Sequence, residues 1–380
     1  MISFALTERD RQLLGEAREQ ARLAVGHARE FEHDEDRMLP REFKEAAGRP
    51  DLRELLDRHA DETSGRKILH ALLYLEDWYG GVPLREARYS LGNTVLEIAG
   101  TPEQYARWAD KTIAIGLTEP IGGSDPASTR TTATFDSATN EWIIEGEKIF
   151  ITYAESCDAV LALARVIQPD RPRQLSTFMI EKGTPGFSVG RQIRKMGIRF
   201  EDTAGLSFSN CRIPAFNHID GDLKKTLRSF SESRPVVAAY ALGVSRAAMD
   251  FTWARLAEIG VTPDYEAGPT RLTAAADRML ELEAEWEATW ITVVRAKWVE
   301  QNEGPGKIES SVAKAMGGGL AREATQACIE ILGACGLSAE HLAEKWFRDA
   351  RIFDIYEGTG EIQRLIIARD LLGYSPKELN

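Results

Sequence analysis

Cysteine is scarce in this sequence. The four cysteines, Cys157, Cys211, Cys328 and Cys335, form no Cys-x-x-Cys pair and have no neighbouring histidines at ligand spacing. This argues against a metal centre and against disulfides, and reduced thiols lead us to expect a cytoplasmic protein. No apolar run approaches the ~20 residues of a membrane span, and the first ten residues become charged too soon for a signal peptide. We therefore expect no membrane association.

Positive charge is also in short supply. The chain has 47 Lys and Arg against 59 Asp and Glu, a formal net charge of −12. Nucleic acid is therefore not an expected partner, because a polyanion is not attracted to such a surface. The sequence also lacks a Gly-x-Gly-x-x-Gly turn between a strand and a helix, which weighs against a nicotinamide-binding dinucleotide fold.

What is present suffices for a multidomain globular protein, since 43% of 380 residues are hydrophobic. Residues 1–115 are rich in Glu, Arg, Leu and Ala, which predicts an N-terminal helical domain. Residues 116–220 contain short β-branched and aromatic runs between turn residues, which predicts a middle β-domain. Helical texture returns at 221–380 and predicts a C-terminal helical bundle. The fold class is thus mixed α and β.

Two local patterns support the helical segments. Thr101-Pro-Glu-Gln104 is a capping box with proline at the first helical position. An apolar stripe at four-residue spacing lies within the predicted bundle, and a bundle core is favoured over an oligomer surface as its explanation. The stripe consists of Leu282, Trp286, Trp290, Val294 and Trp298.

A carboxylate at a glycine turn is the strongest candidate for chemistry. The segment Arg351-Ile-Phe-Asp-Ile-Tyr-Glu-Gly-Thr-Gly-Glu-Ile-Gln-Arg364 places Glu357 just before an amphipathic helix. Glycine at 358 removes the Cβ that would keep another molecule from the backbone, and Thr359 is positioned to cap the helix. Such a turn is also an ordinary helix entry, so its meaning depends on the rest of the chain.

Two upstream segments agree with a catalytic reading. Gly116-Leu-Thr-Glu-Pro-Ile-Gly-Gly-Ser-Asp125 precedes Gly146-Glu-Lys-Ile-Phe-Ile-Thr152. With the Tyr-Glu-Gly-Thr turn, they resemble the signatures of the acyl-CoA dehydrogenase family, from about Ala99 to Leu372. The resemblance implies an FAD-dependent enzyme that introduces an α,β double bond into an acyl-CoA thioester and passes electrons to an electron-transfer flavoprotein. A flavin or nicotinamide is needed because no side chain accepts hydride.

The resemblance also implies a set of FAD contacts. Thr118 matches a threonine that bonds the flavin, and Gly123 and Ser124 match residues at the pyrophosphate. Phe150 takes the aromatic position beside the isoalloxazine, usually tryptophan, and Thr152 the hydroxyl near N5. Thr359 and Glu361 match positions at the phosphate and adenosine side, where Glu361 departs from the usual glutamine and would repel a phosphate. Phe150 is otherwise an ordinary strand core residue and Thr152 an ordinary β-former.

On the substrate side, Glu357 resembles the base that removes the α-proton, and its environment is expected to raise its pKa. Arg234 and Gly358 are the expected substrate-binding positions. Some members of the family take the base from another helix, where this chain has Ser233. The neighbouring Glu232 is the remaining alternative base.

Departures cluster where a neighbouring subunit usually contributes to the FAD site. The family commonly has an Arg-x-x-Phe-Gly turn where this chain has residues 257–269 without arginine. A glutamine is replaced by Glu330, and a glycine by Ala334. We therefore predict a hetero-oligomer with a homologous acyl-CoA dehydrogenase subunit, with a homotetramer as the alternative.

Two other functions stay open: a flavin oxidase or monooxygenase on the same fold, and a subunit that supports a catalytic partner. The acyl group is also open, with fatty acid, steroid side-chain and ring substrates all compatible. Divergent segments at 46–50 and 78–81 are candidates for widening the acyl pocket.

Overall fold

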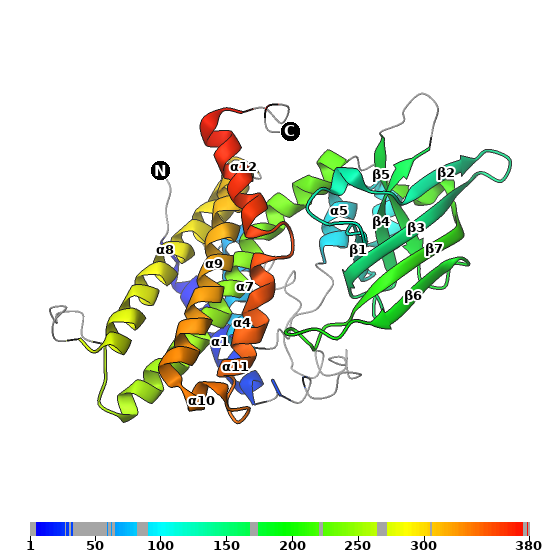
Figure 1. The fold of residues 1–380 in the computed structure, drawn as a ribbon. Helices are drawn as coiled ribbons and strands as arrows, with labels where there is room; N and C mark the ends of the chain where they lie inside the picture. The colour runs from blue at the N-terminus through cyan, green and yellow to red at the C-terminus, as the bar shows by residue number, and fades with distance from the viewer. Residues whose placement is uncertain are drawn as a thin grey trace. The chain divides into compact units, whose positions relative to one another are not determined.

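The computed structural model describes residues 5–26, 28–29, 32, 59, 62, 65–81, 90–167, 174–219, 223–263, 272–304, 306–374 and 378. Along this part of the chain the order is helical, β, helical, as predicted from the sequence (Figure 1). The chain divides into two compact units. Unit 1 comprises residues 1–85, 196–198 and 231–380, and unit 2 comprises 86–195 and 199–230. The predicted domain boundaries after residues 115 and 220 stay a prediction.

Unit 2 is built around one sheet. Its eight strands among the described residues are β1 (Ile113–Gly116), β2 (Thr132–Asp136), β3 (Glu141–Thr152), β4 (Ala159–Val166), β5 (Leu175–Glu181), β6 (Phe187–Gln192), β7 (Thr203–Pro214) and β8 (His218–Ile219). The strand order is β6-β7-β3-β2-β4-β5-β8, with β1 pairing β4 in parallel. β3 and β7 pair antiparallel along most of their lengths, with irregularities after Ile144 and after Lys148. The second irregularity falls within a predicted FAD-binding motif.

Two short helices cover part of this sheet. The helices α5 (Leu91–Ala99) and α6 (Pro102–Trp108) lie in unit 2. Thr101 and Gln104 form the predicted reciprocal capping box at the start of α6. Val95, Leu96 and Trp108 pack against buried apolar residues of the sheet. This apolar contact stabilises the packing of the two helices on the sheet, by about 25 cal/mol for each Å² of apolar surface buried.

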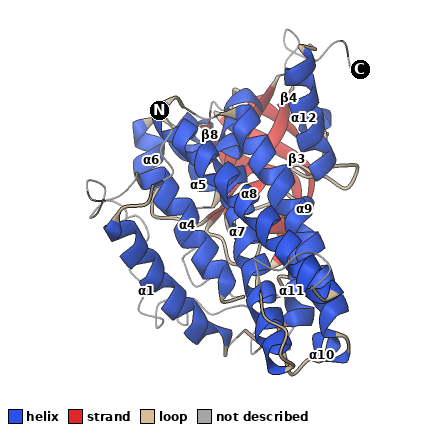
Figure 2. Ribbon diagram, turned by 90° about the vertical axis from the view of Figure 1, so that its left-hand side faces the viewer, coloured by secondary structure: helices blue, strands red, loops and turns tan. Residues whose placement is uncertain are grey.

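Unit 1 is a helical bundle. Its elements are α1 (Glu8–Val25), α4 (Arg66–Tyr79), α7 (Leu223–Glu258, from residue 231), α8 (Ala274–Asn302), α9 (Lys307–Leu332), α10 (Ala334–Leu337), α11 (Ala343–Asp349), the 3-10 helix η5 (Ala350–Asp354) and α12 (Gly360–Leu372). The helix α9 packs against α8, α11, α12 and η5 (Figures 1 and 2). Gly317 of α9 lies so near Ala238 of α7 that a Cβ there would approach it to 2.8 Å. No helix in the described ranges is long and apolar enough to cross a membrane.

Only some residues of the apolar stripe on α8 are buried. Leu282 and Val294 are buried, whereas Trp286, Trp290 and Trp298 are half-buried in the single chain. The indole N–H of Trp286 donates to the carbonyl oxygen of Leu242 on α7, at 3.0 Å. Part of the stripe therefore lies in the bundle core, as favoured from the sequence.

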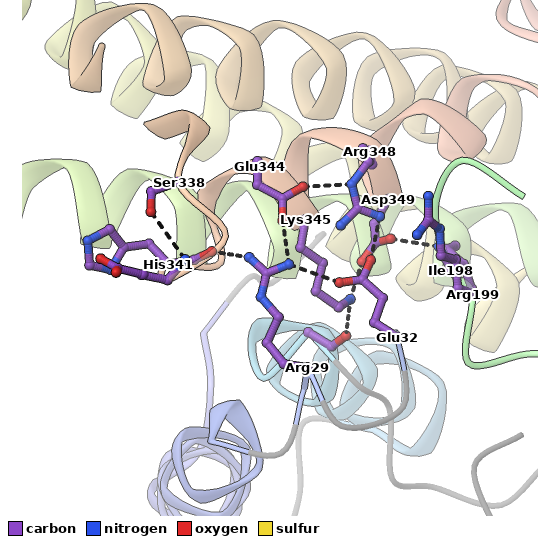
Figure 3. Close-up of polar contacts among 12 residues, drawn as sticks. Arg29, Glu32, Ile198, Arg199, Ser338, His341, Glu344, Lys345, Arg348 and Asp349 are labelled. Atoms are coloured by element: carbon purple, nitrogen blue, oxygen red, sulfur yellow. Dashed lines mark hydrogen bonds and ion pairs between the residues drawn. The ribbon is translucent and has the colours of Figure 1, made fainter. Parts of the chain in front are cut away.

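An ion cluster ties α11 to the N-terminal part of unit 1 (Figure 3). Arg29 forms ion pairs with Glu32, at 3.1 Å, and with Glu344. Arg348 contacts the same two carboxylates, with Glu344 at 2.7 Å. Because two arginines share two carboxylates, removing one carboxylate weakens several contacts together.

A second, fully buried pair continues this cluster. Lys345 pairs with Asp349 and donates to the carbonyl oxygen of Gly81 at 2.9 Å (Figure 3). Asp349 also accepts from the backbone N–H of Ile198 at 2.6 Å. One pair of side chains thus holds the turn after α4 and the 196–198 segment against α11. The ion pair satisfies charges that would be costly to bury alone.

The ion cluster predicts an acid-sensitive contribution to stability. Hydrogen bonds and Coulomb attraction from Arg348 and Arg29 overcome burial and hold the pKa of Glu344 below its ordinary value of 4.5. A lowered folded pKa means that the stabilisation is complete above the ordinary value and is lost as the pH falls through the folded value. Glu344→Gln should therefore reduce the free energy of unfolding by about 0.5–1 kcal/mol near pH 7, and this difference should shrink below about pH 4.

Urea unfolding of the wild type and Glu344→Gln at several pH values measures this difference. The exposed Glu340 offers a matched control, since Glu340→Gln should leave the midpoint unchanged. A Glu344→Gln effect that is independent of pH would contradict the assignment.

Candidate active site

The turn that carries Glu357 has an unusual backbone. It lies between η5, which ends at Asp354, and α12, which begins at Gly360. Glu357 has a φ of 56° and Gly358 a φ of 93°, so two successive residues are left-handed. A side chain other than glycine in this region is strained by about 1–3 kcal/mol, and such positions cluster at functional sites.

Three buried donors from three helices hold this turn. Arg234 Nε of α7 donates to the carbonyl oxygen of Glu357 at 3.2 Å, and Lys314 Nζ of α9 to that of Gly358 at 3.2 Å. Gln363 Nε2 of α12 donates to both, at 3.3 and 3.0 Å. All three donor side chains belong to buried residues. The strain of the turn is therefore balanced by hydrogen bonds that water cannot replace.

Glycine at 358 is required by close packing as well as by φ. A Cβ at this position would lie 2.5 Å from Nε2 of Gln363. Gly360 is equally constrained, because its Cβ would meet Oδ1 of Asp354 at 2.3 Å. The absence of a side chain at 358 thus allows Nε2 of Gln363 to reach the carbonyl groups of Glu357 and Gly358.

The carboxylate of Glu357 is held on one oxygen. Ser233 Oγ of α7 donates to Oε2 of Glu357 at 2.5 Å. Burial raises the pKa of Glu357, as expected from the sequence, while the Ser233 hydrogen bond and the positive charges of Arg234 and Lys314 act in the opposite direction. Burial lowers the pKa of Lys314 to about 8. The carboxylate is therefore a stronger proton acceptor than an exposed one, yet has charge partners when ionised.

Glu232, the alternative base, has other charge partners. Its carboxylate lies 3.7 Å from Lys67 Nζ of α4, and its carbonyl oxygen accepts from Lys297 Nζ of α8 at 2.8 Å. Lys297 in turn contacts Glu300 at 2.6 Å. These contacts orient Glu232 toward α4 and α8. The carboxylate that Ser233 contacts is that of Glu357.

Two predicted residues at the start of α12 serve the helix itself. Thr359 is the N-cap, and its hydroxyl accepts from the N–H of Ile362 at 3.4 Å, as expected from the sequence. Glu361 is exposed in the first helical turn. A carboxylate there interacts favourably with the helix dipole. This gives Glu361 a structural reason independent of any phosphate.

In unit 2, a buried ion pair joins the two upstream motifs. Lys148 Nζ of β3 lies 2.8 Å from Oε1 of Glu119 and 2.9 Å from Oγ1 of Thr129. Glu119 also accepts from the N–H groups of Arg130 and Thr131, at 2.7 and 2.9 Å. Hydrogen bonds from Lys148 and both threonines outweigh burial and lower the pKa of Glu119 to about 2. Glu119 is therefore a structural anion and not a base.

This ion pair sets the position of the predicted FAD-binding residues of unit 2. Lys148 Nζ also donates to the carbonyl oxygen of Leu117 at 3.3 Å, and the N–H of Ile149 donates to that of Thr118 at 2.9 Å. Gly123 lies against Thr118, since a Cβ on it would be 3.3 Å from the threonine hydroxyl. The loop is therefore folded tightly around Thr118.

Phe150 is turned outward from the strand that contains it. It lies within the irregularity between Lys148 and Ile151, has a φ of 58°, and is 62% exposed. The interpretation of Phe150 as an ordinary strand core residue is therefore wrong. A β-bulge re-aims a side chain in this way, and the sequence alone carried no signal for it. Thr152 lies two residues further on, half-buried and paired with Thr203.

The donor set of unit 2 fits a flavin nucleotide. Within the described part of the chain, the hydroxyls of Thr118, Ser124 and Thr152 have no hydrogen-bond partner. Gly122, Gly123 and Ser124 are exposed, and a Cβ on Gly122 would meet nothing within 4 Å. Available hydroxyls and an open glycine loop suit a polar anionic ligand, and an exposed aromatic ring suits a planar one.

Comparison with known proteins identifies the family. The model of the acyl-CoA dehydrogenase middle domain matches residues 114–211, and that of the acyl-CoA dehydrogenase C-terminal domain matches residues 223–372. The chain belongs to the acyl-CoA dehydrogenase family. The predicted fold class is thereby confirmed, since both matched domains correspond to the β and C-terminal helical parts of the chain.

Individual acyl-CoA dehydrogenases and their relatives resemble the chain over most of its length. The short-chain specific acyl-CoA dehydrogenase of Bos taurus is 34% identical over 72% of this chain and 67% of its own. An acryloyl-CoA reductase (NADH) of Anaerotignum propionicum is 33% identical over 68% and 66%. The structure of butyryl-CoA dehydrogenase from Megasphaera elsdenii has a TM-score of 0.81 and 26% identity, covering 98% of this chain and 100% of the other.

The structure describes only some of the residues that were expected to contact the FAD of a neighbouring subunit. Glu330 is exposed on α9 and accepts from Gln326 Nε2 at 3.0 Å, and Ala334 begins α10. Of the arginine-free turn, residues 264–269 lie outside the described residues. Residues 46–50 lie outside them as well, while α4 ends at Tyr79 and is followed by Gly80 and Gly81.

The sequence did not predict the buried residues that hold the backbone of the candidate site. Glu119 and Lys148 lie within the two upstream sequence motifs, but nothing in the sequence shows that these two side chains pair. Lys314 and Gln363 gave no signal, because a lysine or glutamine on a helix is ordinarily exposed. Only the packing of α9 and α12 beneath the turn gives these two residues a role.

The Glu119–Lys148 pair predicts a large loss of stability when it is broken on one side. Lys148→Met should destabilise unit 2 by about 3–5 kcal/mol, because the carboxylate would stay buried without its cation. The Glu119→Gln/Lys148→Met double variant should cost less than the sum of the single changes. Urea unfolding measures both, with the exposed Lys111→Met as the matched control. Additive effects would show that the two side chains are not coupled.

Proposed function

We propose that this chain is an FAD-dependent acyl-CoA dehydrogenase in which Glu357 removes the α-proton of an acyl-CoA thioester. The observation that carries the proposal is the strained turn at Glu357, whose carbonyl groups are held by buried donors and whose carboxylate has a raised pKa. Family membership supports the reaction type. The strain and the burial support this residue as the one that carries it.

The chemistry asked of Glu357 is proton abstraction. A proton next to a thioester is weakly acidic, so its removal needs a positioned base and groups that stabilise the developing enolate. Burial makes the carboxylate of Glu357 a better acceptor, and Arg234 and Lys314 favour its ionised form. Arg234 and Gly358 are the proposed substrate-side positions, and Arg234 also fixes the carbonyl group of Glu357.

The FAD would be held by the exposed loop and strand residues of unit 2. The proposed contacts in unit 2 are Thr118, Gly123, Ser124, Phe150 and Thr152. In unit 1, Thr359 and Glu361 of α12 are the proposed positions for a phosphate or adenosine contact. When bound, FAD supplies the hydride acceptor that the chain lacks. An electron-transfer flavoprotein is the proposed recipient of the electrons, since the reduced cofactor must be reoxidised before another turnover.

A second candidate is the reverse reaction. The relative named as an acryloyl-CoA reductase (NADH) matches nearly as much of this chain as the dehydrogenases do. In that direction the protonated form of Glu357 would return a proton to the α-carbon, by microscopic reversibility. Assaying both saturated and α,β-unsaturated acyl-CoA with dye and NADH distinguishes the two directions.

Replacing the base tests the proposal directly. Glu357→Gln keeps the side-chain volume but removes the proton acceptor, so flavin reduction by acyl-CoA should fall by roughly 10² to 10⁴. Stopped-flow absorbance of the flavin under anaerobic conditions measures the rate. The exposed Glu340→Gln, outside the proposed site, is the matched control and should retain reduction. Unchanged kinetics in Glu357→Gln would transfer the role to another carboxylate, with Glu232 the next to test.

The acidic substitutions at the proposed neighbour-facing positions predict poor flavin retention by the chain alone. Glu330 stands where the family has a glutamine, and a carboxylate near a pyrophosphate repels it. Glu330→Gln should tighten FAD binding by roughly tenfold, about 1.4 kcal/mol. Co-expression with a homologous subunit that has the Arg-x-x-Phe-Gly turn should restore full flavin content.

Flavin-to-protein ratio after dialysis measures both effects. Glu287→Gln, an exposed acid on α8, is the control for a change of net charge alone. A fully flavinated, active homotetramer of the unmodified chain would contradict the hetero-oligomer prediction.

A further inference from the structure

Ser233 Oγ donates a hydrogen bond of 2.5 Å to the carboxylate oxygen Oε2 of Glu357. The two residues are 124 positions apart in sequence and come from α7 and from the turn before α12. The main chain of this turn is already held by Arg234 and Gln363. The hydrogen bond from Ser233 therefore restricts the side-chain torsions of Glu357, which the backbone contacts leave free.

A hydroxyl donor on one oxygen makes the two carboxylate oxygens unequal. Oε2 accepts the hydrogen bond from the Ser233 hydroxyl, which leaves Oε1 to receive a proton from a substrate. The hydrogen bond also favours the ionised form of Glu357, against the effect of burial. A single hydroxyl can therefore orient the base and keep it ionised at the same time.

The charges around this pair come from four elements. Arg234 of α7 and Lys314 of α9 act on the carboxylate of Glu357. Lys314 itself faces Asp354 of η5 and Glu361 of α12. The cations favour ionised Glu357 whether or not Ser233 is present, so removing the hydroxyl should shift the base without abolishing it.

The residue type at 233 also decides how many carboxylates share the site. A carboxylate at this position would lie within hydrogen-bond reach of Glu357, and two adjacent carboxylates share one proton with strongly separated pKa values. Serine adds a donor without adding a charge. Glu357 can therefore titrate as a single base.

We propose that Ser233 is a positioning residue that holds Oε2 of Glu357 and leaves Oε1 as the atom that accepts the α-proton. This inference rests on the proposed function, since it concerns the same base. It assigns to Ser233 a part in proton transfer that does not require the serine to touch the substrate.

Proton transfer can be measured separately from oxidation. The flavin-loaded protein is incubated with butyryl-CoA in D₂O without an electron acceptor, and deuterium entering the α-carbon is followed by mass spectrometry from pH 5 to pH 9. In Ser233→Ala the acid limb of the exchange rate should move up by about one pH unit, because loss of a donor to the ionised form raises the pKa of the base. At a pH below the limb this corresponds to about tenfold slower exchange.

Two further variants separate positioning from general structure. Ser233→Thr keeps the hydroxyl and should follow the wild-type profile. Ser229→Ala removes a buried hydroxyl one turn earlier on α7, which donates to the carbonyl oxygen of Thr226, and should also follow the wild-type profile. Thermal unfolding of each variant shows whether the helix is intact.

The outcomes are distinct. A shifted limb in Ser233→Ala, with rescue in Ser233→Thr, supports the inference. Superimposable profiles for the wild type and Ser233→Ala, with exchange lost in Glu357→Gln, would overturn it and leave the proposed function standing. Equal exchange in the wild type and Glu357→Gln would remove the proposed function and this inference together.

Discussion

The carbonyl groups of Glu357 and Gly358 point at buried donors from three helices, and the candidate site depends on this constraint. Without Arg234, Lys314 and Gln363, the strained left-handed backbone of Glu357 would have no compensating hydrogen bonds. Their hydrogen bonds fix the backbone from which the carboxylate projects. The direction of the base is thus decided by the bundle core.

In each unit a buried lysine donates hydrogen bonds to the backbone of a candidate functional segment. In unit 2 a buried lysine, Lys148, supports the loop of Thr118 and the strand irregularity that exposes Phe150. In unit 1 a buried lysine, Lys314, supports the turn of Glu357. In both cases a long side chain carries a cation to backbone oxygen atoms inside the protein, where water cannot take its place. In both units a fully buried lysine therefore holds the backbone next to a candidate functional residue.

Much of the fold followed from local chemistry. The capping box at Thr101 and the N-cap at Thr359 formed as expected, because a cap bonds to residues only three positions away. The alternation of helical and β-rich texture was equally local. The left-handed backbone of Phe150 was not predictable in this way, since phenylalanine favours a regular strand and only the pairing of β3 with β7 imposes the irregularity.

The sequence by itself determined the order of helices and strands, the motifs and the family resemblance, because these depend on residue types and on spacing along the chain. Tertiary structure alone decided which side chains meet. Ser233 and Glu357, and Lys314 and Gly358, are distant in sequence and are joined only when α7, α9 and the last turn pack together. Burial then sets the pKa of Glu357, since desolvation depends on every neighbour that excludes water and not on the residues beside it in the chain.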